Sequence, residues 1–137
     1  MTVLLNVFLF VCVGIAMEVA FTAVVGFCRE RCPRLRGHSY LWMGFTYGAV
    51  PLILTLVYPP IHDMPIPARL AIYVALVYAV EYGWGWLLRR LTGHCPWDYG
   101  RARFAVNGLI RLDYLPGWAA ACWMFERLFV ALNGRLG

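Results

Sequence analysis

The chain has 137 residues, of which 62% are hydrophobic and only 14% are charged. Soluble domains contain about 25% charged residues, and a soluble core of this size cannot cover so much apolar surface. Intrinsic disorder is excluded, because disordered chains are poor in apolar residues. Five cysteines, an odd number, argue against a disulfide scaffold. The composition predicts an all-α integral membrane protein with one domain, residues 1–137.

The net charge of +5 comes from 12 basic residues, all of them arginine, against 7 acidic ones. Such a balance first suggests a nucleic-acid partner. The arginines, however, occur in short clusters between apolar runs, which is the distribution that orients membrane helices. We therefore expect the lipid bilayer as a partner and no nucleic acid.

Four apolar runs are each long enough to cross ~30 Å of hydrocarbon. They predict four transmembrane helices, at about residues 2–27, 39–61, 68–91 and 114–134. Helices are expected because lipid offers no hydrogen-bond partners to backbone amides. The first run is too long for a signal peptide and has no basic residue before it, so we interpret it as a retained helix. Residues 96–113 are expected either to lie at the membrane interface as a short helix, which we favour, or to dip into the bilayer.

The arginines also predict an orientation in the membrane. Those near the connections gather between the first and second helices and after the third: Arg29, Arg31, Arg34, Arg36, Arg89, Arg90, Arg101, Arg103 and Arg111. The positive-inside rule therefore places loops 28–38 and 89–113 in the cytoplasm and both termini outside. The expected location is a bacterial inner membrane or its equivalent.

Ionisable residues inside membrane spans are costly and are therefore functional candidates. Glu18, Glu81 and Glu126 lie in three different runs, ~12 to ~20 Å from the predicted cytoplasmic boundary at 1.5 Å per residue, and Tyr47 reaches a similar level. We expect at least two of these groups to share an interior cavity or a hydrogen-bond network. Buried carboxylates can retain a proton at neutral pH and exchange it for a cation, or they can simply fix helix packing. Arg127 is expected either to pair with one of them or to point outward, and we slightly favour the pairing.

The cysteine and histidine pattern gives little support for a metal site. Cys28 and Cys32 are four residues apart, and His94 and Cys95 are adjacent, but this spacing is too irregular for a typical zinc site. We expect reduced thiols, with no metal and no cofactor. The sequence contains no recognisable catalytic serine, phosphate-binding loop or metalloprotease motif, so we assign no catalytic residue and interpret the protein as more likely not an enzyme.

The pentapeptide Cys95–Tyr99 (Cys-Pro-Trp-Asp-Tyr) resembles a family pattern. The chain is similar, over about residues 12–130, to the vertebrate transmembrane protein 229 family and to bacterial relatives called putative ABC-transporter type IV or CmpB-like. Further matching positions are spread over all four predicted helices and the segment after the pentapeptide: Glu18, Val19, Phe21, Thr22, Trp42, Phe45, Tyr47, Gly48, Glu81, Tyr82, Phe104, Gly108, Leu109, Ile110, Leu112, Asp113, Tyr114, Trp118 and Glu126.

The resemblance implies a four-helix integral membrane protein without implying a specific activity. It supports Glu18, Tyr47, Glu81, Trp97, Asp98, Tyr99 and Gly108 as family positions without roles. Cys95, Pro96 and Asn107 are further candidates in the segment that we expect to be cytoplasmic. Three functions stay open. The first is a proton- or cation-linked transport component that uses the carboxylates. The second is an accessory subunit of a larger membrane complex, and the third is an intramembrane enzyme acting on lipid. A homo-oligomer or a partner chain is expected, because four helices are few for a carrier.

Overall fold

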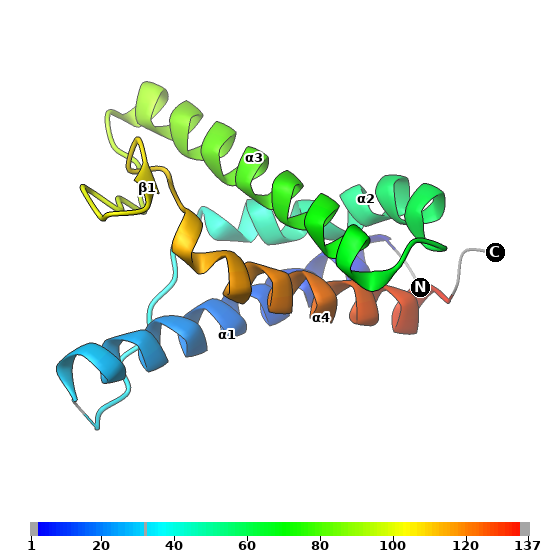
Figure 1. The fold of residues 1–137 in the computed structure, drawn as a ribbon, viewed down its shortest axis with the longest axis horizontal. Coiled ribbons are helices and arrows are strands. Elements are labelled where there is room, and N and C mark those ends of the chain that lie inside the picture. Colours follow the sequence, from blue (N-terminus) through cyan, green and yellow to red (C-terminus); the bar gives the residue numbers. More distant parts are fainter. Residues whose placement is uncertain (1–2, 32, 135–137) are drawn as a thin grey trace. The chain divides into compact units, whose positions relative to one another are not determined.

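The computed structural model describes residues 3–31 and 33–134, and helices make up most of this part of the chain (Figure 1). The helices are α1 (Val3–Glu30), α2 (Met43–Ile61), α3 (Ile66–Thr92) and α4 (Leu115–Asn133). Two short strands, β1 (Ala105–Val106) and β2 (Ile110–Arg111), and the 3-10 helix η1 (Leu112–Tyr114) lie between α3 and α4. The chain divides into two compact units, residues 1–53 and 54–137, and each is described by itself.

Three helices, α1, α2 and α3, are long and apolar enough to cross a membrane. The fourth predicted span is not supported, although α4 forms close to the expected residues. The physical reason is composition: α4 has 19 residues, and the adjacent charges of Glu126 and Arg127 lower its mean hydropathy. A charged pair is costly in hydrocarbon.

In the first unit, the connection after α1 returns along that helix in an extended conformation (Figure 1). The Thr22 hydroxyl accepts the backbone N–H of His38 at 2.8 Å and donates to the His38 carbonyl at 2.9 Å. Gly37 lies directly against the backbone of Val19, where a Cβ would not fit. This close approach brings Ser39, two residues further on, to the side chain of Glu18 in α1.

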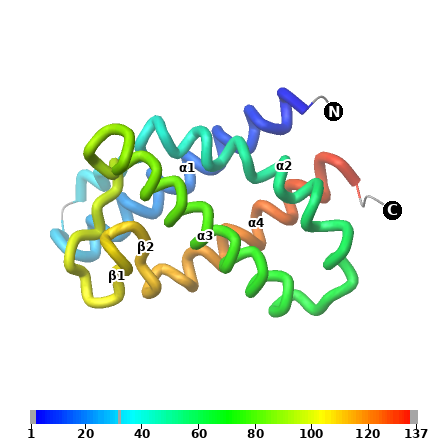
Figure 2. Tube along the Cα trace, turned by 90° about the horizontal axis from the view of Figure 1, so that it is seen from above, coloured from blue at the N-terminus to red at the C-terminus, as the bar shows by residue number. Residues whose placement is uncertain are grey.

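In the second unit, α4 runs back along α3 (Figures 1 and 2). Helix α3 begins directly after Pro65, with proline in its first turn, where the missing N–H costs nothing. It ends at Gly93, whose positive φ of 80° allows its N–H to donate to the Arg89 carbonyl at 3.0 Å. Phe129 of α4 is fully buried, and its ring contacts Tyr58.

The segment between α3 and α4 forms a small hairpin at the C-terminal end of α3 (Figure 2). Strands β1 and β2 are antiparallel, and Val106 pairs with Ile110. The turn contains Asn107 and Gly108, both with positive φ. An Asn-Gly pair favours hairpin turns because these two residues adopt positive φ most readily. A short interfacial helix was expected here, and this turn chemistry explains why the structure has a hairpin instead.

Candidate functional site

Glu18 of α1 is held by two hydroxyl groups within the first unit. Ser39 donates to Glu18 Oε2 at 3.0 Å, and the Tyr47 hydroxyl donates to the same oxygen at 3.1 Å. Gly14 lies one helical turn before Glu18, and a Cβ there would overlap the Tyr47 ring. The glycine therefore creates the space that lets Tyr47 reach the carboxylate. The structure brings these two predicted site residues together.

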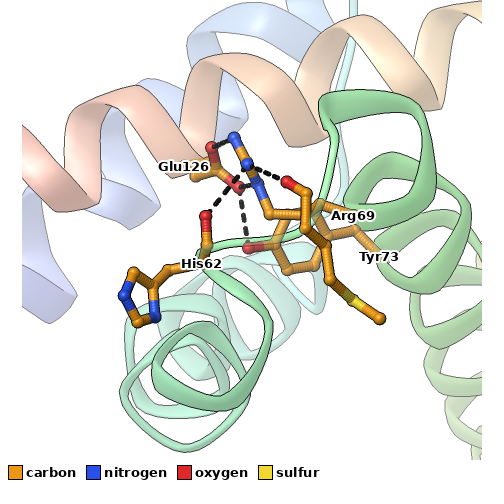
Figure 3. A network of polar contacts seen from close by, with 5 residues as sticks. His62, Arg69, Tyr73 and Glu126 are labelled. Atoms are coloured by element: carbon orange, nitrogen blue, oxygen red, sulfur yellow. Dashed lines mark hydrogen bonds and ion pairs between the residues drawn. The ribbon is translucent and has the colours of Figure 1, made fainter.

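Glu126 of α4 is bound by two side chains from the first turns of α3 (Figure 3). Arg69 donates from Nε to Oε2 at 2.9 Å and from Nη2 to Oε1 at 2.8 Å, which is a bidentate ion pair. The Tyr73 hydroxyl donates to Oε2 at 2.8 Å. The side chains of Arg69 and Glu126 are only 12% and 5% exposed. Three donors and a balancing charge compensate for the burial of this carboxylate.

Arg69 also fastens the connection between α2 and α3. Its Nη1 donates to the carbonyls of His62 at 3.2 Å and Met64 at 2.6 Å (Figure 3). One guanidinium thus joins a loop, the start of α3 and the face of α4. Such an arrangement stabilises the packing of two helices and holds the charge of Glu126 in place.

Arg127, the neighbour of Glu126, points elsewhere. It is exposed, and its guanidinium lies 5.6 Å from the centre of the Trp123 ring on the same helix. The interaction is a cation–π contact on the outside of α4. Of the two orientations that the sequence left open, the structure shows the outward one, and Arg69 occupies the place of the pairing partner.

Glu81 lies near the middle of α3 and is 4% exposed. The Tyr99 hydroxyl donates to Glu81 Oε1 at 2.8 Å. Tyr99 is the last residue of the pentapeptide that carries the family resemblance, so this motif contacts one of the predicted carboxylates. The loop after α3 reaches back to the helix and supplies a neutral hydrogen-bond donor to a buried acid.

Glu81 and Glu126 lie at different levels of the second unit. Glu126 binds Arg69 and Tyr73, whereas Glu81 follows Arg69 by twelve residues on α3, which is ~18 Å along the helix axis. We expected Glu126 at the level of Glu81 because its depth in the membrane was counted from Asp113, just before the fourth predicted helix. The structure folds that part of the chain back onto α3, where the Tyr78 hydroxyl donates to the Arg111 carbonyl at 2.9 Å.

The loop between α3 and α4 packs closely on the last turns of α3. The Trp97 ring is buried, and its Nε1 donates to the Leu109 carbonyl at 3.1 Å. A Cβ at Gly85 would lie 3.1 to 3.3 Å from atoms of Leu109, Cys95 and Trp97, so the glycine permits this contact. Burial raises the pKa of the Cys95 thiol.

An open pocket of about 440 Å³ lies at this end of the second unit. Asp98 Oδ1 accepts the N–H of Gly100 at 2.8 Å, so the carboxylate caps a turn of the loop. The side-chain amide of Asn107 donates to the Tyr82 hydroxyl at 2.8 Å and so ties the hairpin turn to α3. The pocket is lined by Arg89, Gly93, His94, Cys95, Asp98, Gly100, Asn107 and Gly108.

Four residues were considered as metal ligands from the sequence: Cys28, Cys32, His94 and Cys95. Within residues 3–31 and 33–134, no group of three or more histidine, cysteine or acidic side chains is arranged to hold a metal ion. Cys32 lies outside the described residues. His94 and Cys95 both line the pocket, and Cys28 is exposed at the end of α1.

Sequence reasoning missed three partners of the carboxylates. Arg69, Tyr73 and Ser39 were not among the predicted site residues. The spacing of Arg69 and Tyr73, four residues apart on one helix, is the available signal, because such residues share a helix face. Their pairing with α4 depends on tertiary packing.

The chain belongs to the family described as putative ABC-transporter type IV, whose family model matches residues 5–135. No solved structure matches the chain. The resemblance to the vertebrate transmembrane protein 229 family stays a prediction.

Proposed function

We propose that this protein is a membrane-embedded transport component in which Glu81 carries a proton or a cation. The observation that carries the proposal is a carboxylate, almost fully buried within a helix apolar enough to span a membrane, with a tyrosine hydroxyl bound to it. A carboxyl group can release a proton and bind one again, and the Tyr99 hydroxyl donates a hydrogen bond to the carboxylate. A group of this kind exchanges protons at little structural cost.

The other two carboxylates receive different roles in this proposal. Glu126 is charge-balanced by Arg69 and therefore fixes α4 against α3. Glu18, half-buried and bound by Ser39 and Tyr47, is the second candidate for proton exchange. The membership of a transporter family supports this assignment at the level of the protein class.

Energy from ATP would require a nucleotide-binding domain outside these 137 residues. The phosphate-binding loop of ATPases needs a lysine, and the sequence contains none. We therefore propose that a partner chain supplies such a domain, and that further copies of this chain add to its small number of helices. We also propose that the arginine-rich connections face the cytoplasm, following the positive-inside rule.

The test is proton movement into liposomes. The full chain is reconstituted in liposomes that contain a pH-sensitive dye, and a potassium diffusion potential drives protons inward. We expect Glu81→Gln to reduce the flux to the rate of protein-free liposomes, because the amide cannot release a proton. The amide oxygen still accepts the Tyr99 hydrogen bond, so folding is preserved.

The matched control is Glu30→Gln at the exposed end of α1, which should leave the flux unchanged. Circular dichroism and gel filtration verify that all variants fold and reconstitute equally. Wild-type flux in Glu81→Gln would reject a transport role for this carboxylate, as would a wild-type protein that moves no protons and no sodium ions.

A further inference from the structure

The pocket beside the hairpin offers charges of both signs to the same space. Arg89 is half-buried in the last turn of α3, and Asp98 is exposed in the loop that follows. A Cβ at Gly108 would lie 2.7 Å from Asp98 Oδ1 and 3.4 Å from Arg89 Nη2. The guanidinium and the carboxylate therefore both lie against Gly108, and both residues line the same pocket.

Backbone hydrogen bonds hold both charged groups in position. Arg89 Nη1 donates to the Asn107 carbonyl at 3.0 Å, and Asp98 Oδ1 accepts the Gly100 N–H at 2.8 Å. Within the described part of the chain, neither side chain forms an ion pair. Both charges can therefore interact with a ligand. Because both side chains are already oriented, less conformational entropy is lost when a ligand binds.

The backbone conformation at Gly108 favours glycine. Its φ is 69°, a conformation that residues with a side chain rarely adopt, and the residue is buried between the two charged groups. His94 and Asn107 also line the pocket and add polar groups to its wall. The volume of about 440 Å³ lies in the range of small-ligand sites.

The end of α3 beside the pocket has the residues that are typical of a membrane–water interface, where lipid headgroups lie. Arg89 and Arg90 end α3, one of the three helices that can cross a membrane. Trp86 and Phe104 are exposed at the same end of the unit, and arginines lie over both rings. Exposed aromatic rings and arginines are typical of the membrane–water interface.

We propose that this pocket binds phosphoethanolamine, with the phosphate at Arg89 and the ammonium group at Asp98. Two carbons and an oxygen separate phosphorus from nitrogen in this group, so one molecule can contact both charges at once. A phosphate alone would satisfy the arginine and meet repulsion from the carboxylate. The inference stands apart from the proposed transport function, since its test measures binding only.

The experiment compares three probes by isothermal titration calorimetry on the full chain in a maltoside detergent. Dioctanoyl phosphatidylethanolamine carries the ammonium group, dioctanoyl phosphatidylglycerol replaces it with a glycerol, and free O-phosphoethanolamine lacks the acyl chains. We expect the wild type to bind the ethanolamine lipid about fivefold more tightly than the glycerol lipid, as for one exposed ion pair.

Two variants assign the charges. Asp98→Asn keeps the oxygen that accepts the Gly100 N–H and should abolish the preference for the ethanolamine lipid. Arg89→Gln should weaken both lipids about tenfold, because a charge-assisted hydrogen bond to the phosphate is lost. Arg101→Gln, an exposed arginine outside the pocket lining, is the matched control and should change neither affinity.

Equal affinity of the wild type for the two lipids would overturn the proposal without any variant. An unchanged preference in Asp98→Asn would also overturn it. Binding of free O-phosphoethanolamine with the same dependence on Asp98 supports the headgroup alone as the ligand. Binding of the lipid only, again with that dependence, supports a membrane lipid as its source.

Discussion

Two buried carboxylates of the second unit, Glu126 beside the start of α3 and Glu81 near the middle of that helix, are bound in opposite ways. Near the start of the helix, Glu126 receives a bidentate guanidinium and a tyrosine hydroxyl (Figure 3). Twelve residues later, Glu81 receives the hydroxyl of Tyr99 from a tightly packed hairpin loop. A charge-balanced carboxylate is suited to holding two helices together, whereas a carboxylate bound by a neutral donor is suited to changing its protonation. The comparison separates a stabilising site from a candidate working site on one helix.

The largest expected effect comes from removing the charge of Glu126. Glu126→Gln leaves the buried guanidinium of Arg69 without a counter-charge, so we expect the free energy of unfolding to fall by about 3 kcal/mol. The measurement is unfolding in mixed detergent micelles followed by circular dichroism. Arg127→Gln, on the exposed side of the same helix, should change it by about 0.5 kcal/mol or less.

A double-mutant cycle sharpens this result. In Glu126→Gln combined with Arg69→Gln, both charges are absent, and the loss should be clearly smaller than the sum of the two single losses. Additive losses would show that the ion pair does not couple the two helices.

The next effect concerns the packing of the hairpin loop at the other end of α3. Gly85→Val places methyl groups where even a Cβ is within 3.3 Å of Trp97, and we expect a loss of about 2 kcal/mol from overpacking. Gly83→Val on the same helix is the matched control, because a Cβ there meets no atom within 4 Å. Equal losses in the two variants, measured by the same unfolding assay, would contradict this account of the loop contact.

The smallest effect is expected for Tyr99→Phe, which removes one hydroxyl and keeps the ring. We expect a loss of about 1 kcal/mol, the value of one hydrogen bond, together with a changed pH dependence of proton flux. The same unfolding and liposome assays apply. The matched control is Tyr40→Phe, because the Tyr40 hydroxyl has no hydrogen-bond partner in the described part of the chain; it should change neither the stability nor the flux. A proton flux that does not respond to Tyr99→Phe would contradict a working role for the Glu81 site.

The helices could be predicted from the sequence because apolar runs identify them directly, and the structure places each within a few residues of the expected bounds. The depth of Glu126 could not be predicted, since it depends on where α4 begins relative to α3. The hairpin was missed although the Asn107-Gly108 pair is a recognised turn signal, because residues 96–113 were expected to form a short helix at the membrane interface. The pairing of Arg69 with Glu126 could not be predicted either, because it joins residues 57 positions apart through tertiary packing.

The ion pair between Arg69 and Glu126 has a consequence for how the chain is made. The two residues are separated by 57 positions, whereas Tyr99 follows Glu81 by only 18. A ribosome therefore releases Arg69 long before its counter-charge exists, and the guanidinium stays hydrated or bound elsewhere until the last helix arrives. Assembly of the second unit must finish with α4, and truncation before Glu126 leaves a cation that no later residue neutralises.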